Sequence, residues 1–154
     1  MMRSVPYLSF AALVLAALAL VPAGAHFFAL PNKIGLTQED YFTAQGIYRG
    51  WSLFGVVLIG SLLANLALAV ALRRQRMPCL FAAAGAVLMA AVLLLFFAFI
   101  YPANQATANW TAVPENWDML RTQWEYGHAV NAGLTFAAFI CVAVSALGAR
   151  REAV

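Results

Sequence analysis

The chain has 154 residues, of which 64% are hydrophobic and only 10% are charged, and its formal net charge is +3. Soluble domains have about 45–50% apolar and about 25% charged residues. This composition therefore excludes an ordinary soluble domain and indicates an integral membrane protein.

Four apolar stretches follow one another, at about residues 7–30, 47–72, 78–101 and 124–148. Each reaches the roughly 20 residues that a helix needs to cross about 30 Å of hydrocarbon. The sequence therefore predicts an all-α fold, an antiparallel four-helix bundle that forms a single membrane domain over residues 1–154.

The first stretch has a second interpretation. Arg3, an apolar run over residues 7–20 and the segment Ala23-Gly24-Ala25 together resemble a secretory signal peptide with an Ala-x-Ala cleavage site. Cleavage would leave three spans. The apolar stretch continues through residues 26–30, however, which favours an uncleaved first helix.

The connections between the stretches are unequal in length. Residues 31–46 form a predicted outer loop, in which Thr37 precedes Asp40 in the spacing of a helix N-cap. Residues 73–78 form a tight hairpin, with Pro78 suited to the first turn of the next helix. Residues 102–123 form a second outer loop, which is long enough to be a lid or a binding loop.

The positive charges predict the orientation in the membrane. Three basic residues, Lys33, Arg49 and Arg121, lie on the side of the two outer loops. The other side of a four-span arrangement carries six: Arg3, Arg73, Arg74, Arg76, Arg150 and Arg151. The positive-inside rule then puts both termini in the cytoplasm, in what we expect to be a bacterial inner membrane. The arginines lie at helix ends near anionic headgroups, so they do not indicate a nucleic-acid partner.

Small residues recur at four-residue spacing in the last two stretches. They are Ala82, Ala86 and Ala90 in one, and Gly133, Ala137, Cys141 and Ser145 in the other. Such faces allow close approach of helices in lipid and could also support a homo-oligomer. Asn65 is expected to form a hydrogen bond between helices. Cys79 and Cys141 are isolated and do not form the CxxC pair of a thiol oxidoreductase.

A polar stripe enters the last stretch. Set as a helix, its members fall within one arc roughly 120° wide; they are Arg121, Trp124, Glu125, His128, Asn131 and Thr135. Glu125 can pair with Arg121 and approach His128 on this face. An aromatic belt with a helix-end ion pair would explain the outer members alone. It does not require His128 and Asn131 to continue the stripe inward, and ionisable groups at that depth usually face a bundle interior.

His26 lies about one turn from the outer end of the first stretch, at a depth similar to that of His128 in antiparallel helices. We therefore predict that His26 and the stripe line one cavity that opens to the outer side.

The residues around this stripe carry a family resemblance over residues 25–33, 48–51, 102–111 and 117–131. The pattern Asn…Trp…Arg-x-x-Trp-Glu-x-x-His resembles the DUF1772, or anthrone oxygenase-like, family. Many of its members carry an arginine shortly after the histidine, where this chain has Asn131. The resemblance implies four membrane helices and the oxidation of a small lipophilic phenol or anthrone by O₂ without a cofactor.

In that interpretation His128 is the general base and Glu125 orients it. Arg121 stabilises the resulting enolate or phenolate. The substrate-binding residues would be His26, Asn104, Trp110, Trp124 and Asn131. Asn104 or Asn131 would add hydrogen-bond donors, and the tryptophans would stack on the substrate.

Two other classes of protein remain open. Without any catalytic role, the chain could be a small membrane subunit or scaffold. Alternatively, His26 and His128 could be the facing ligands of a haem or another metal site, as in four-helix cytochromes.

Overall fold

The computed structural model describes residues 4–149, and their regular structure is helical. Four helices are long and apolar enough to cross a membrane. The first is α1 (Val5–Lys33), and the second is α3 (Phe54–Ala71) with the short turn η3 (Trp51–Leu53) before it. The third begins as α4 (Arg76–Leu95), and the fourth is α6 (Trp117–Gly148).

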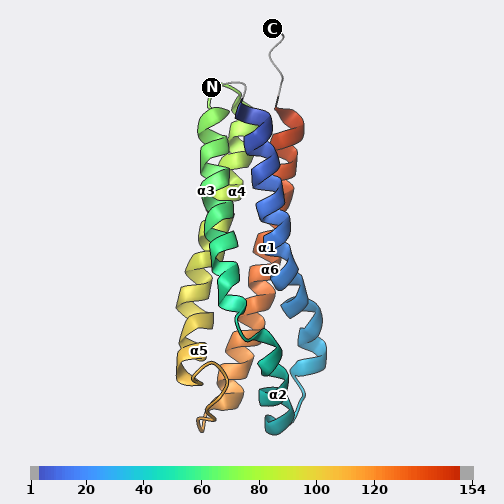
Figure 1. Cartoon of the computed structure of the whole chain (residues 1–154), viewed down its shortest axis with the longest axis vertical. Helices are drawn as coiled ribbons and strands as arrows, with labels where there is room; N and C mark the ends of the chain where they lie inside the picture. The colour runs from blue at the N-terminus through green and yellow to red at the C-terminus, as the bar shows by residue number, and fades with distance from the viewer. Residues whose placement is uncertain (1–3, 150–154) are drawn as a thin grey trace.

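The four spans form an antiparallel bundle in which α1 packs against α6 and α3, and α4 packs against the same two helices. Figure 1 shows the N-terminus and the connection between α3 and α4 at one end of the bundle, here called the terminal end. The short helices α2 (Gln38–Gln45) and α5 (Tyr101–Ala106) lie at the other end, here called the loop end. The predicted membrane four-helix bundle is therefore confirmed.

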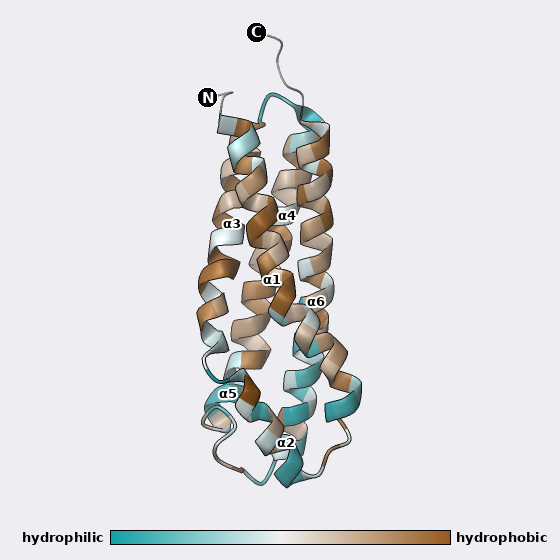
Figure 2. Cartoon of the chain, turned by 45° about the vertical axis from the view of Figure 1, so that its right-hand side comes forward, coloured by the Kyte–Doolittle hydropathy of each residue, from teal (hydrophilic) through white to brown (hydrophobic). Residues whose placement is uncertain are grey.

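Two helices extend beyond their expected ends and shorten the second outer loop. The third span continues from α4 through the π-helical turn η4 (Phe96–Ile100) into α5, and α6 begins at Trp117 rather than near residue 124. Only residues 107–116 are left between them. The hydropathy pattern missed the end of the third span and the start of α6 because these turns project beyond the apolar zone, where polar side chains are tolerated (Figure 2).

Local signals fixed two other helix ends as expected. The Thr37 side chain accepts a hydrogen bond from the backbone N–H of Asp40 at 3.3 Å and so caps α2. Pro78 is the third residue of α4, where a missing backbone N–H is tolerated. Between α2 and α3, the turn η2 (Gly46–Tyr48) and Gly50, with a left-handed φ of 85°, redirect the chain into the second span.

The terminal half of the bundle is packed through small side chains. Ala82 and Ala86 are buried as expected, whereas Gly133 is exposed and Cys141 is half-buried. Ser145 is buried and donates a 2.7 Å hydrogen bond to the carbonyl oxygen of Pro78, which ties α6 to α4. Only the exposed part of the small-residue face of α6, at Gly133, is free for contact with a second copy of the protein. The homo-oligomer stays a prediction.

Asn65 differs from expectation. Its Nδ2 donates a 2.8 Å hydrogen bond to the carbonyl oxygen of Ser61 in the same helix, and its Oδ1 lies against Gly85 of α4. A Cβ on Gly85 would lie 2.7 Å from that oxygen. The predicted bond between helices is wrong because the backbone four residues earlier is the nearer acceptor.

Candidate functional site

A cavity of about 550 Å³ lies in the loop-end half of the bundle. Residues of α1, α3, α4 and α6 line it, together with the segment 42–52 and the loop after α5. Its polar and aromatic lining includes His26, Phe42, Gln45, Tyr48, Arg49, Trp51, Asn104, Trp110, Trp124, His128, Asn131 and Thr135. Apolar walls with a few convergent polar groups are typical of small-molecule sites.

The two histidines meet inside this cavity. The rings of His26 and His128 are stacked, with centroids 3.8 Å apart and an interplanar angle of 25°. His26 is only 5% exposed, and its Nδ1 has no hydrogen-bond partner among the described residues. The structure brings both histidines to one cavity, because antiparallel α1 and α6 bring them to the same depth.

Trp124 forms the wall beside the histidines. Its ring lies edge-on to His26 at 4.9 Å and to His128 at 4.3 Å between centroids. The indole Nε1 donates a 2.8 Å hydrogen bond to Oδ1 of Asn104, and Nε1 of Trp110 donates to the same oxygen at 3.2 Å. Two indole donors identify that atom as the amide oxygen, so the Asn104 amide nitrogen is a donor at the edge of the cavity.

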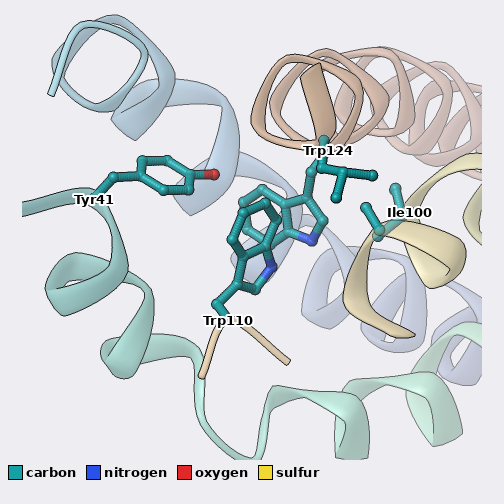
Figure 3. Close-up of a cluster of buried hydrophobic side chains, with 6 residues drawn as sticks. Tyr41, Ile100, Trp110 and Trp124 are labelled. Atoms are coloured by element: carbon teal, nitrogen blue, oxygen red, sulfur yellow. The ribbon is translucent and has the colours of Figure 1, made fainter. Parts of the chain in front are cut away.

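The loop after α5 holds Trp110 in place at a cost in backbone conformation. Ala108, Asn109 and Trp110 have φ values of 47°, 55° and 63°, a left-handed region that residues other than glycine rarely adopt. The Thr107 hydroxyl accepts from the Trp110 backbone N–H at 3.1 Å and donates to the carbonyl of Ala103 at 2.8 Å. Backbone strain of this kind often accompanies functional sites. The Trp110 and Trp124 rings, both labelled in Figure 3, are in edge contact with centroids 5.7 Å apart.

A buried ionic network supports the cavity from behind Trp124. Nζ of Lys33 lies 2.8 Å from Oε1 of Glu125, and both side chains are nearly inaccessible. The Tyr41 hydroxyl donates to the same carboxylate oxygen at 3.0 Å and accepts from Nε2 of Gln45. The Lys33 ammonium also lies 4.9 Å from the centroid of the Trp124 ring, a cation–π distance.

This network corrects the predicted partner of Glu125. The carboxylate is paired with Lys33 of α1 and not with Arg121, and its hydrogen bond comes from Tyr41 rather than from His128. Sequence reasoning missed Lys33 and Tyr41 as site residues because neither is near Glu125 in the chain. The one available signal was the cost of a carboxylate at membrane depth, which requires a partner.

Arg121 points away from the cavity. Its guanidinium forms an ion pair with Asp118 and donates a 2.8 Å hydrogen bond to the carbonyl oxygen of Leu36. It also lies 4.7 Å from the centroid of the Trp117 ring. The hydrogen bond to Leu36 ties the start of α6 to the segment between α1 and α2. Neither Arg121 nor Glu125 lines the cavity, so the predicted stripe divides into a cavity face and a supporting face.

Asn131 and Thr135 extend the cavity lining toward the middle of the bundle. Asn131 is 7% exposed, and its Oδ1 has no hydrogen-bond partner among residues 4–149. The Thr135 hydroxyl donates to the backbone carbonyl of Asn131 at 2.7 Å. An unpaired amide on this wall is available to a polar group of a ligand.

The histidine geometry differs from that of a bis-histidine haem site. The two haem ligands stand on opposite sides of the macrocycle, whereas the His26 and His128 rings are in face-to-face contact at 3.8 Å. Nowhere in residues 4–149 do three or more His, Cys, Asp or Glu residues lie close enough to hold a metal ion.

These features define an integral membrane protein of the four-helix class with a histidine- and tryptophan-lined cavity at one end. The model of the family described as anthrone oxygenase matches residues 45–141, more than half of the chain. The chain belongs to this anthrone oxygenase family. The match includes Trp124 and His128 but begins after His26 and Lys33 in the chain. Searches of curated proteins and of solved structures gave no match.

Proposed function

We propose that the protein is a membrane oxygenase that uses O₂, without a bound cofactor, to oxidise a lipophilic phenol or anthrone-like compound in the loop-end cavity. The observation that carries this proposal is the stacked pair His26 and His128 within an aromatic cavity. Membership of the anthrone oxygenase family supports the same class of reaction.

The chemistry requires a base and a place for negative charge. His128 would take a proton from the substrate, since a neutral imidazole that lines the cavity is a common general base. The resulting enolate or phenolate passes an electron to O₂, and the two radicals combine to form a carbon–oxygen bond. The peroxide that results takes back the proton from His128, and loss of water then leaves a carbonyl group, so one oxygen atom enters the product and the other leaves as water.

The surrounding side chains fit supporting roles. The Asn104 amide nitrogen, oriented by two indole N–H groups on its oxygen, would donate to the anionic oxygen of the substrate. His26, stacked on His128, would hold the ring of the base in position. Trp110 and Trp124 would pack against the flat substrate. Glu125 and Arg121 would act indirectly, by holding α6 and Trp124 in place, because their contacts lie outside the cavity.

The test is turnover of an anthrone by the purified protein in nanodiscs, followed as O₂ consumption and quinone absorbance above the uncatalysed rate. A general base contributes typically about 10²–10⁴-fold, so His128→Gln should lose most of the activity. Tyr126→Phe is the matched control, since Tyr126 is 54% exposed on the same helix. Full activity of a folded His128→Gln protein would refute the assignment of the base, and absence of turnover by the wild type would refute the oxygenase.

The proposed orientation puts the cavity on the outer face of a bacterial inner membrane, with both termini in the cytoplasm. It rests on the basic residues of the terminal end, of which Arg73, Arg74 and Arg76 are described; Arg3, Arg150 and Arg151 lie outside the described residues. Reporter fusions after residues 75 and 110 test it. A periplasmic reporter that is active after residue 75 would reverse the orientation.

A further inference from the structure

The walls of the cavity differ in chemistry. The α6 wall is polar and includes His128, Asn131 and Thr135. Apart from His26, the lining residues of α1 and α3 are apolar, with Pro22 and Ala23 on α1 and with Phe54, Gly55 and Leu58 on α3. A ligand that fills this space therefore needs a polar edge toward α6 and an apolar part toward the seam between α1 and α3.

The seam between α1 and α3 is closed toward the terminal end and open beside the cavity. A Cβ on Gly60 would meet the Leu15 side chain of α1 at 3.5 Å, so the two helices touch there. A Cβ on Gly55 would have no heavy atom within 4 Å. Figure 1 shows α1 and α3 diverging toward the loop end, in agreement with this difference.

The open part of the seam lies within the membrane-spanning segments, which include Trp51–Ala71 and Val5–Lys33. Gly55 lines the cavity and is itself only half-buried. The residues before and after the pair Phe54 and Gly55 are exposed, Leu53 of η3 to 76% and Val56 of α3 to 73%. Large exposed apolar side chains on a membrane helix mark the surface that contacts lipid. The free space at Gly55 is therefore continuous with the lipid-facing side of the bundle.

We propose that the cavity has a lateral opening between α1 and α3, bordered by Pro22, Ala23, Phe54 and Gly55. Through it the protein takes a phenol that carries an aliphatic chain directly from the bilayer. The phenol head lies against the histidines, and the chain extends through the opening into lipid. The identity of the head group rests on the proposed function, whereas the opening rests on the geometry of the two helices.

The physical advantage of this route concerns the aliphatic chain of the ligand. An aliphatic chain that remains in lipid keeps its apolar surroundings while the phenol head of the ligand enters the cavity. Entry through the aqueous mouth, where Arg49, Asn109 and Thr111 line the cavity and are exposed, would expose the chain to water. A substrate dissolved in the membrane therefore has a direct path to His128.

The experiment measures binding of 4-nonylphenol and 4-methylphenol to the full chain in nanodiscs. The readout is the change in tryptophan emission, since Trp51, Trp110 and Trp124 line the cavity. Affinities are expressed per mole fraction of ligand in the bilayer. Gly55→Leu should lower the ratio of nonylphenol to methylphenol affinity about tenfold, because its side chain fills the opening. Ala23→Phe, on the opposite border, should act in the same direction.

Gly24→Leu is the matched control, because a Cβ on Gly24 meets nothing within 4 Å and this residue does not line the cavity. An unchanged affinity ratio in both folded border variants would overturn the lateral opening. An equal fall in the ratio for Gly24→Leu would overturn it as well. A fall confined to the border variants supports the opening even if no phenol is oxidised, and in that case only the proposed oxygenase fails.

Discussion

The two halves of the bundle are built on different principles. In the terminal half, small buried residues such as Ala12, Ala16 and Ala82 let the helix backbones approach closely. In the loop-end half, large rings such as Trp110 and Trp124 hold the helices apart and leave a cavity. Residue size along the same helices thus decides where the bundle is a scaffold and where it has room for a ligand.

The halves also differ in how polar groups are stabilised. In the terminal half, Ser145 and Asn65 bond to nearby backbone carbonyls, which requires no charge. In the loop-end half, an ammonium and a carboxylate are buried together with a tyrosine hydroxyl. Because a buried charge depends fully on its partners, substitutions should have larger effects at the loop end than at the terminal end.

The largest expected effect on stability is that of breaking the ion pair. Lys33→Met should lower the free energy of unfolding by about 3–5 kcal/mol, because the Glu125 carboxylate would remain buried without its cation. Unfolding in mixed detergent, followed by circular dichroism, measures this. The double variant Lys33→Met/Glu125→Leu should recover much of the loss. A single variant as stable as the wild type would mean that the pair does not stabilise the loop end.

The next effect concerns the hydroxyl of Tyr41. Burial and the adjacent Glu125 carboxylate raise the pKa of Tyr41 above its ordinary value, so the group remains a neutral donor at pH 7. Tyr41→Phe removes this hydrogen bond to a charged acceptor and should cost about 1.5–3 kcal/mol. The loss should be constant from pH 6 to pH 9. Phe42→Leu, at the next residue of α2, is the control, because a phenylalanine side chain has no hydrogen bond to lose. Equal stability of Tyr41→Phe and wild type would contradict the role of the hydroxyl.

Close packing at the terminal end predicts a smaller effect. Gly85→Ala would put a Cβ 2.7 Å from Oδ1 of Asn65 and 3.4 Å from Cγ2 of Val142, and should destabilise by about 1–3 kcal/mol. Gly133→Ala is the matched control, because a Cβ there meets nothing within 4 Å. If the two variants have the same melting temperature, the contact between α3 and α4 is looser than described.

The smallest effect is expected at Cys141, which is half-buried in the terminal half. Cys141→Ala removes one sulfur atom and should cost less than about 1 kcal/mol, with turnover unchanged. The same preparation of protein serves for melting and for the anthrone assay. A loss of activity in this variant, without a loss of stability, would show that the terminal half takes part in catalysis and would weaken the contrast between the halves.

Much of the architecture was determined by the sequence alone. Four apolar stretches of sufficient length require four membrane helices, because backbone polar groups in lipid must be satisfied within each segment. The 3.6-residue period placed Trp124, His128 and Asn131 on one face of α6, and all three line the cavity. Antiparallel spans of similar length placed His26 at the depth of His128.

The tertiary structure decided the partners. Arg121 and Glu125 are one helical turn apart, which favoured a local ion pair, yet Glu125 pairs with Lys33 of α1 and Arg121 turns to Asp118 and the Leu36 carbonyl. A buried carboxylate gains most from partners that are buried with it. Which residues those are depends on how α1 and α2 pack against α6, and that packing is set by contacts between segments far apart in the chain.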